Sequence, residues 1–387
     1  MQNEFRFSFF EVSCTHIRHK MPNGYSIALK ALQRSRSTLS DKEILEQIRY
    51  SKKINVWTCT WNMHAKSWPE DLGKALGISD SQQMNHMYVI GTQECQKSIL
   101  TSAFLPSKWM WESSLIKCFG DRYALVRSET MQALHVVVFV HRALLPHVKD
   151  IHTASVPTGI RIKPTSVRLG NKGGVGIRFC VGKTRFAFVT CHLSAHQHRV
   201  RRRNEDFARI NAVMNMKMSD DLKKISKKGS LMKQFFMYIK KQAIRRNSRV
   251  ATSYNLTMNE SLDHQVWLGD FNYRIDHNDP EIVIKTINEG KYMSLLSRDQ
   301  LSQERHKDKS FPGGLKEGNV TFKPTYKFDP NTDNYARKKR RIPSWTDRIL
   351  YVPKKGTKLV KYISLDEIRT SDHRPVVGVF SCVVSGV

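Results

Sequence analysis

The sequence has no stretch of about 18 consecutive apolar residues, so it offers no candidate for a membrane-spanning helix. Its opening residues, MQNEFRFSFFEVSCTH, lack the basic, apolar and small-residue order of a signal peptide, and its final CVVSGV is not a prenylation motif. The seven cysteines are scattered, odd in number and without a Cys-x-x-Cys pair, which argues against a disulfide framework and a cysteine zinc site. We therefore expect a protein of a reducing compartment, the cytoplasm.

Acidic residues are scarce compared with basic ones. The 387 residues include 34 Asp and Glu against 64 Lys and Arg, which gives a formal net charge of +30 at pH 7. Such an excess concentrates polyanions near the surface, and nucleic acid, an anionic membrane and phosphorylated small molecules all fit it. The Walker phosphate-binding motif and the Gly-x-Ser-x-Gly motif of serine hydrolases are also missing. Charge alone leaves the choice among these partners open.

Short segments rich in Val, Ile, Phe and Trp predict buried β-strands from residue 54 onward. Helical patterns lie between some of them, notably at Glu205–Met218 and Pro280–Gly290. This order predicts an α/β protein, one large domain in which two packed sheets carry helices outside. The strand segments are INVWTCTWN (54–62), MYVIGTQE (87–94), ALHVVVFVHR (133–142), GGVGIRFCVG (173–182), RFAFVTCHLS (185–194), HQVWLGDFNYR (264–274) and RPVVGVFSCVV (374–384).

Two segments differ from this strand-rich texture. Residues 1–50 are predicted to form an N-terminal helical extension, because Ile44, Leu45 and Ile48 recur at helical spacing after STLSD. A strongly basic insertion occupies about residues 216–262 and has the small apolar cluster LMKQFFMYI in its middle. A basic amphipathic helix can lie on an anionic membrane, although a surface helix packed on the domain has the same pattern.

Polar residues capable of catalysis border five of the apolar segments. Each of them alone is more often structural: Gly-Asp-x-Asn is typical of a strand that runs into an Asx turn, for example. A sheet gathers its strand ends along one edge, so the five together predict a single pocket there. The five borders are TWN at Thr60, GTQE at Gly91, TCHL at Thr190, GDFN at Gly269 and TSDH at Thr370.

These residue types favour magnesium over zinc, because they supply carboxylates, amides and two histidines but no cluster of Cys and His. Glu94, with Asn62 nearby, offers the hard oxygen ligands that Mg²⁺ prefers. Asp270 and Asn272 can orient a water and brace a phosphoryl oxygen, and a His beside an Asp, such as His373, can stabilise charge on that group. Together with the basic charge, this predicts metal-assisted hydrolysis of a phosphate ester.

Two further segments place basic residues where they can grip a second phosphate. RRIPSWTDRILYV sets Asp347 and Arg348 just before an apolar strand. NVTFKPTYKFD sets Tyr326 and Lys327 after a proline that fixes the local backbone. An Arg paired with a carboxylate inside the fold would give the same pattern, so a structural role stays open for each.

With these residues assembled, the chain resembles the inositol polyphosphate 5-phosphatases of the endonuclease/exonuclease/phosphatase superfamily. Two long blocks carry the resemblance, WLGDFNYR at Trp267–Arg274 and RIPSWTDRIL at Arg341–Leu350. Shorter pieces follow the family's order over about residues 53–383, namely TWN, GTQE, GNKGGV, CHLSAH, RRNEDF, PTYKFD and SDHRPV. The resemblance implies a DNase I-like fold, with two mostly antiparallel sheets in a sandwich flanked by helices, and makes residues 51–387 the catalytic domain.

The resemblance also implies a role for each residue of the metal and water site. Glu94 would be the direct Mg²⁺ ligand, with Asn62 as its partner and Asp372 near the metal. Asp270 would orient or deprotonate the attacking water, and Asn272 would fix that water and stabilise the five-coordinate transition state. Attack would be in line, without a covalent phosphoenzyme.

Two histidines would face the reacting phosphate. His373 would contact the scissile group, with its ring held by Asp347, and His192 would also point toward the phosphate. Further residues would bind the substrate, several of them at the neighbouring 4-phosphate, although the run KKRR at Lys338–Arg341 allows a slip of one residue. At the 4-phosphate these residues are Tyr326, Lys327, one of Arg202 and Arg203, and Lys339, for which Lys338 or Arg340 is an alternative; Lys172 and Arg348 would lie close to the pocket.

The function expected from this resemblance is removal of the 5-phosphate from phosphatidylinositol 4,5-bisphosphate or 3,4,5-trisphosphate, and from soluble inositol polyphosphates. We expect a monomer that touches the cytoplasmic leaflet through the basic insertion. A nuclease of the same superfamily is the alternative, although PTYKFD and RIPSWTDRIL are phosphatase-type blocks and nucleic acid is not the expected partner. A binding protein with an inactive site is disfavoured, because Glu94, Asp270 and His373 are all present.

Overall fold

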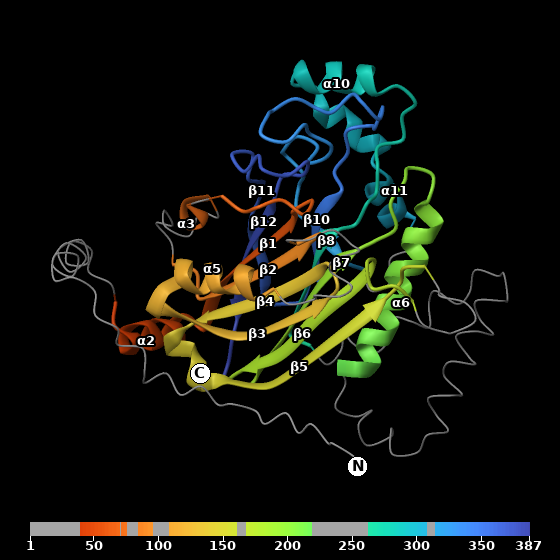
Figure 1. Ribbon diagram of the computed structural model, residues 1–387. Coiled ribbons are helices and arrows are strands. Elements are labelled where there is room, and N and C mark those ends of the chain that lie inside the picture. The colour runs from red at the N-terminus through yellow and green to blue at the C-terminus, as the bar shows by residue number, and fades with distance from the viewer. Residues whose placement is uncertain are drawn as a thin grey trace, which may run out of the picture.

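A computed structural model describes residues 39–69, 71–75, 84–95, 108–160, 168–218, 262–307 and 314–387. Two six-stranded sheets lie face to face, and helices lie on their outer sides (Figure 1). The predicted α/β sandwich is therefore confirmed. Residues 1–38 of the predicted N-terminal extension and residues 219–261 of the predicted basic insertion lie outside the described residues.

The first sheet contains four of the predicted strands at its centre. Its neighbouring strands are antiparallel except for one parallel pair, β1 and β2. In spatial order the strands are β11 (Thr357–Ser364), β12 (Val376–Val383), β1 (Lys53–Asn62), β2 (Met87–Gln93), β4 (Leu134–His141) and β3 (Tyr123–Met131).

The second sheet is built in the same way, with one parallel pair, β7 and β8, among antiparallel neighbours. In spatial order its strands are β5 (Val148–Pro157), β6 (Gly173–Val181), β7 (Thr184–His192), β8 (His264–Asp270), β10 (Asp347–Tyr351) and β9 (Lys316–Glu317). The two strands of each parallel pair end on the same side of their sheet, so the polar residues that follow them lie side by side.

The described α-helices are α2 (Asp41–Ser51), α3 (Leu72–Ala75), α5 (Trp109–Phe119), α6 (Val200–Met218), α10 (Pro280–Asn288) and α11 (Gln300–His306). Short 3₁₀ helices are η1 (Gly120–Arg122), η2 (Arg142–His147) and η4 (Tyr292–Arg298). Both helical segments predicted between the strands are present, as α6 and α10. Within the described part of the chain, no helix combines the length and the apolar character needed to cross a membrane.

Helix α2 forms where the sequence predicted it, because two reciprocal hydrogen bonds, a capping box, close its first turn. The Ser40 side chain accepts from the backbone N–H of Glu43, and the Glu43 carboxylate accepts from the backbone N–H of Ser40 at 2.7 Å. Ile44 and Ile48 on one face are buried in the main core. The helix is thus packed on the core by two of the three apolar residues that predicted it.

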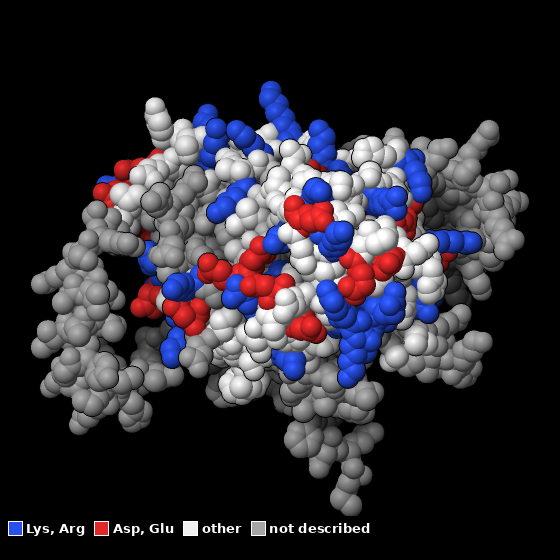
Figure 2. All heavy atoms as spheres, turned by 90° about the horizontal axis from the view of Figure 1, so that it is seen from above, with Lys and Arg blue, Asp and Glu red and all other residues white. Residues whose placement is uncertain are grey.

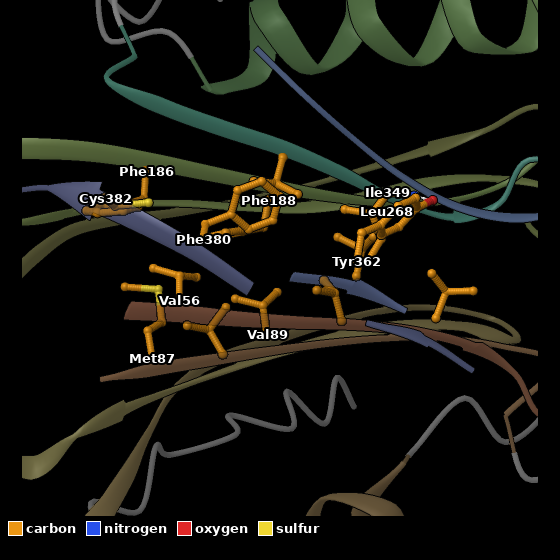
Figure 3. Close-up of a cluster of buried hydrophobic side chains, with 14 of the residues drawn as sticks. Val56, Met87, Val89, Phe186, Phe188, Leu268, Ile349, Tyr362, Phe380 and Cys382 are labelled. Carbon is orange, nitrogen blue, oxygen red and sulfur yellow. Dashed lines mark hydrogen bonds between the residues drawn. The ribbon is translucent and has the colours of Figure 1, made fainter. Parts of the chain in front are cut away.

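The core between the sheets follows from the two-residue alternation of the strands. Met87 and Val89 of β2 face inward. Figure 3 shows these two residues and Val56 on one side of the core, opposite Phe186 and Phe188 of the other sheet. Full burial of a side chain of this size contributes about 1.5–3 kcal/mol to folding. The inner faces of the sheets are therefore held together by a continuous apolar layer.

The outer faces carry the intervening residues of the same strands. Tyr88 and Ile90 of β2 pack under α5, whose Trp111, Leu115 and Phe119 recur at helical spacing. Helix α6 covers the second sheet in the same manner, and its buried face consists of Phe207, Ile210, Val213 and Met214. The two sheets are thus buried on both sides, which explains why their central strands are continuously apolar.

Candidate active site

Three polar residues meet at one edge of the second sheet because of strand register. The parallel pairing of β7 with β8 sets His192 beside Asp270, and the antiparallel pairing of β8 with β10 sets Asp347 opposite Asp270. Nε2 of His192 lies 3.1 Å from Oδ2 of Asp270. The residues come from segments up to 155 positions apart in sequence, counted from His192 to Asp347, and their strands alone bring them together.

The first sheet supplies the other half of the site. Asn62 ends β1, Glu94 follows β2, and the hydroxyl of Ser371 donates to the backbone oxygen of Asn62 at 2.6 Å. That contact anchors the segment before β12, so Asp372 and His373 lie at the same edge. Nδ2 of Asn62 donates to Oδ2 of Asp270 at 3.0 Å, which joins the two sheets across the site.

Asp270 is buried and ionised. Burial opposes its charge, but His192, His373 and Lys172 outweigh it and hold the pKa of the carboxyl below its usual range. Its Oδ1 accepts the backbone N–H of Asn272 at 2.9 Å. An ionised carboxylate fixed from both sides is suited to accept a hydrogen bond from a water and so to orient it.

Asn272 is held as rigidly as Asp270. Its backbone is left-handed, with φ 57°, a conformation that Asn tolerates better than most residues. Its Nδ2 donates to the backbone oxygen of Leu193 at 3.0 Å, and Arg274 donates both to its side-chain oxygen and, at 3.1 Å, to its backbone oxygen. The Asp-x-Asn turn is therefore a preorganised element rather than a simple strand end.

His373 and Asp347 form a buried charged pair. Nδ1 of the ring lies 2.8 Å from Oδ2 of Asp347, which also accepts the hydroxyls of Thr325 and Thr346 at 2.8 and 2.9 Å. Burial alone would lower the pKa of His373, but the Asp347 carboxylate raises it to about 10. The ring is thus a cation at neutral pH, suited to stabilise negative charge on a phosphoryl group.

Two sets of residues can be considered for a metal ion. Donor atoms of Asp270, Asp347 and His373 lie within 4.8 Å of one another. In this set the ring nitrogen of His373 that faces Asp347 carries a proton, so a cation would have to displace a buried hydrogen bond. The set therefore suits charge stabilisation better than metal binding.

Glu94 and Asp372 fit a hard cation better. Burial opposes the charge of Glu94, yet His64, His192 and Lys172 lower its pKa to about 2. Oδ2 of Asp372 accepts from Lys327, while its buried Oδ1 has no hydrogen-bond partner among the described residues. Carboxylate oxygens, one of them without a hydrogen-bond partner, are the ligands that Mg²⁺ prefers.

Asn62 is paired with Gln93, the residue before Glu94, and its side chain bonds to Asp270. Its Nδ2 is committed to Asp270, and its Oδ1 accepts the backbone N–H of His64 at 3.0 Å. A carbonyl oxygen has two lone pairs, so Oδ1 keeps one acceptor position for a cation or a water. Its metal role stays a prediction.

Basic side chains flank the site on two sides. Lys172 contacts Nε2 of His192, and burial lowers its pKa to about 8. Lys172 and Arg202 also line a pocket of about 570 Å³ beside the site. The remaining lining residues are Thr158, Gly159, Ile160, Arg168, Asn171, Ser194, Ala195, His196 and Arg199.

On the other side, Tyr326 lies against His373, and Lys327 lies against its neighbour Asp372. The centroid of the Tyr326 ring lies 4.5 Å from that of the His373 ring, and the Arg274 guanidinium lies 4.4 Å from the centroid of the Tyr326 ring. Lys327 is partly exposed and points its ammonium at Asp372. Lys339 is exposed on the turn at residues 337–340, so its contact with substrate stays a prediction.

The structure corrects two of the predicted substrate contacts. Arg203 is fully buried, and its guanidinium donates to backbone oxygens of His196 and Gln197 at 2.6 and 3.2 Å. Arg348 is also fully buried and pairs with Asp299 and Glu317. Neighbours along a strand point to opposite faces, so Arg348 turns away from the site that Asp347 faces. Both arginines hold the fold together, and Arg202 is the member of its pair that lines the pocket.

Several residues of the site gave no usable signal in the sequence. Thr325 and Thr346 stand inside the quoted blocks, yet a threonine has no pattern that marks it as a donor to Asp347. Arg274 ends WLGDFNYR, but only the turn geometry shows that it grips Asn272. His64 follows β1 in an irregular loop and lies 3.5 Å from both Glu94 and Asp372.

Comparison with known proteins places this geometry in a family. The model of endonuclease/exonuclease/phosphatase family 2 matches residues 59–379. The chain belongs to this family. Its curated relatives include synaptojanin of Caenorhabditis elegans, 33% identical over 86% of this chain, and the type II inositol 1,4,5-trisphosphate 5-phosphatase of Mus musculus, 31% identical over 89%. The chain spans only 28% and 31% of the length of these two family members.

Solved structures agree with the family. The inositol polyphosphate 5-phosphatase domain of SpSynaptojanin, in complex with inositol (1,4)-bisphosphate and a calcium ion, superposes with a TM-score of 0.65 at 27% identity. The match covers 89% of this chain and 90% of that domain. Cimex nitrophorin shares the fold at a TM-score of 0.60 and 22% identity over 86% of this chain and 99% of its own. The resemblance to inositol polyphosphate 5-phosphatases stated from the sequence is thus confirmed.

Proposed function

We propose that the chain is a magnesium-dependent phosphomonoesterase that removes the 5-phosphate of phosphoinositides and of soluble inositol polyphosphates. The observation that carries the proposal is the convergence of Asp270, Asn272, His192 and the cationic His373 on one edge shared by both sheets. A fold shared with a nitrophorin does not decide the chemistry, so the argument rests on these side chains.

Each side chain has a definite task in this proposal. Asp270, ionised and held by Asn62 and Asn272, orients the attacking water and takes its proton. His373 faces the phosphoryl group as a cation, because Asp347 keeps its ring charged and fixed. A magnesium ion on Glu94, with Asp372 and Asn62 nearby, would polarise the phosphoryl oxygens when bound.

The basic residues support a substrate with more than one phosphate. Lys327 and Tyr326 lie on the His373 side of the site, and Lys172 and Arg202 lie on the His192 side. If one phosphate of the substrate is cleaved between these groups, a neighbouring phosphate of the same molecule lies within reach of the basic side chains. This arrangement favours a 5-phosphate next to a 4-phosphate over an isolated one.

Action on lipid in the cytoplasmic leaflet is part of the same proposal. On the face seen in Figure 2, Lys and Arg side chains alternate with patches of Asp and Glu rather than forming one basic surface. The strongly basic insertion at about residues 216–262 is the segment for which we propose peripheral membrane contact. Each Lys or Arg near an anionic leaflet adds about 1 kcal/mol of attraction.

The test is phosphate release with Mg²⁺ and with EDTA, on vesicles that contain phosphatidylinositol 4,5-bisphosphate, 3,4,5-trisphosphate or 4-monophosphate. Release from the first two alone, abolished by EDTA, is the expected result, and Asp270→Asn serves as the matched inactive control. A plasmid-nicking assay runs in parallel. Nicking without phosphate release would replace the proposal by the nuclease alternative.

A further inference from the structure

His64 lies beside the proposed metal ligands and has no part in the function proposed above. It follows β1 in the loop that runs past the end of β2. The backbone N–H of Met63 donates to Gln93 and that of Ala65 donates to Glu94, both at 2.8 Å. These two bonds flank His64 and tie its loop to the backbone of Glu94, so the ring stands next to that carboxylate.

The ring nitrogen Nδ1 lies between two carboxylates. It is 3.5 Å from Oε2 of Glu94 and 3.5 Å from Oδ1 of Asp372. Such distances are long for a hydrogen bond but close to the spacing of two ligands on one ion. Ligands that bind an octahedral cation at about 2.1 Å stand about 3.0 Å apart, so Nδ1 and a carboxylate oxygen now 3.5 Å apart need to close by only about 0.5 Å to share one ion.

A second observation points to a missing partner at the same place. Oδ1 of Asp372 is buried and accepts no hydrogen bond from the described residues. The Asp372 side chain is 3% exposed, so solvent does not readily satisfy this oxygen. A buried carboxylate oxygen without a hydrogen-bond donor destabilises the folded protein, and a bound cation would compensate for the missing donor.

We infer that His64 supplies an imidazole nitrogen to a divalent cation held by Glu94, with Asp372 as its close neighbour. This inference rests on the proposed function only in taking Glu94 as the metal ligand. Carboxylate and water ligands suit both Mg²⁺ and Mn²⁺, whereas an imidazole nitrogen favours a first-row transition metal over Mg²⁺. The nitrogen therefore shifts the preference of the site from Mg²⁺ toward a transition-metal cation such as Mn²⁺.

The test measures metal binding by the full chain after removal of metal, with Mn²⁺ as the probe and Mg²⁺ as its competitor. Free Mn²⁺ is followed by electron paramagnetic resonance, and nitrogen coordination by the ¹⁴N modulation of the Mn²⁺ spin echo. The test variant is His64→Asn. Position 64 has φ 48°, and Asn tolerates this conformation, so the variant keeps the local backbone. His306→Asn, on the exposed end of α11, is the matched control.

We expect the preference for Mn²⁺ over Mg²⁺ to fall by at least about tenfold in His64→Asn, the scale of losing one ordering interaction at a metal site. The ¹⁴N modulation should weaken in this variant and stay unchanged in His306→Asn. An unchanged preference and unchanged modulation in His64→Asn would overturn the inference and leave His64 as an ion-pair partner. Failure of the proposed function would appear separately, as absence of phosphate release by a protein that still binds Mn²⁺.

Discussion

Replacing Arg348 by methionine distinguishes a structural arginine from a substrate contact. Its guanidinium donates to Asp299 at 2.9 Å and to both oxygens of Glu317 at 2.6 and 2.7 Å, and none of the three side chains is more than 1% exposed. Removal of one partner from a buried ion pair destabilises a protein by about 3–5 kcal/mol. The variant leaves two buried carboxylates without this arginine.

The surroundings place the expected loss at the lower end of that range. Asp299 keeps the N–H and hydroxyl of Ser302, and Glu317 keeps Arg305 at 3.1 Å and the hydroxyl of Tyr362 at 2.8 Å. We therefore expect Arg348→Met to lower the free energy of unfolding by about 3 kcal/mol. With a urea slope of about 3 kcal/mol per molar, the unfolding midpoint should fall by about 1 M.

The assay is urea unfolding followed by circular dichroism, together with kcat and KM for phosphate release. Arg202→Met is the matched control, because Arg202 lines the pocket with a side chain that is 39% exposed. The control should raise KM and leave the midpoint nearly unchanged. If Arg348→Met instead kept its midpoint and raised KM, Arg348 would contact substrate and our structural assignment would be refuted.

Three further changes test the site and its support. Asp270→Asn should lower kcat by at least about a hundredfold with an unchanged circular dichroism spectrum, and near-normal turnover would remove Asp270 from water activation. Gly91→Ala places a Cβ 1.8 Å from Oγ1 of Thr190 in the opposite sheet, so both the unfolding midpoint and the activity should fall; full activity would show that the sheets separate freely there. Deletion of residues 220–249 should weaken phosphate release from anionic vesicles and spare soluble inositol 1,4,5-trisphosphate, whereas equal loss on both would exclude a membrane role.

The strands predicted from sequence are those at the centre of the sheets. The four missed ones, β11, β3, β5 and β9, are the edge strands. An edge strand has a neighbour on one side only, and its side chains are partly exposed: β11 reads TKLVKYIS with only Tyr362 buried. Charged residues at such edges discourage pairing with other chains, and they also dilute the apolar pattern that marks a strand.

Site residues at strand ends were predictable because the central strands that carry them have a clear apolar pattern. Asp270 and His192 end apolar runs, and parallel strands place their ends together. The positions of these residues in the sequence were therefore enough to predict that they meet. The side-chain direction of Arg348 did not follow from its motif, because it depends on the partners that the fold brings from Asp299 and Glu317. His64 depends on a loop conformation, for which the sequence offers no periodicity.

The position of β12 ties the site to a segment late in this sequence. This strand lies beside β1 near the middle of its sheet, and the residues just before it supply Asp372 and His373. A chain truncated before Asp372 leaves β1 with an open edge and the Asp347 carboxylate without its histidine. Such a chain lacks two of the residues proposed for the site, Asp372 and His373, so we expect it to release no phosphate.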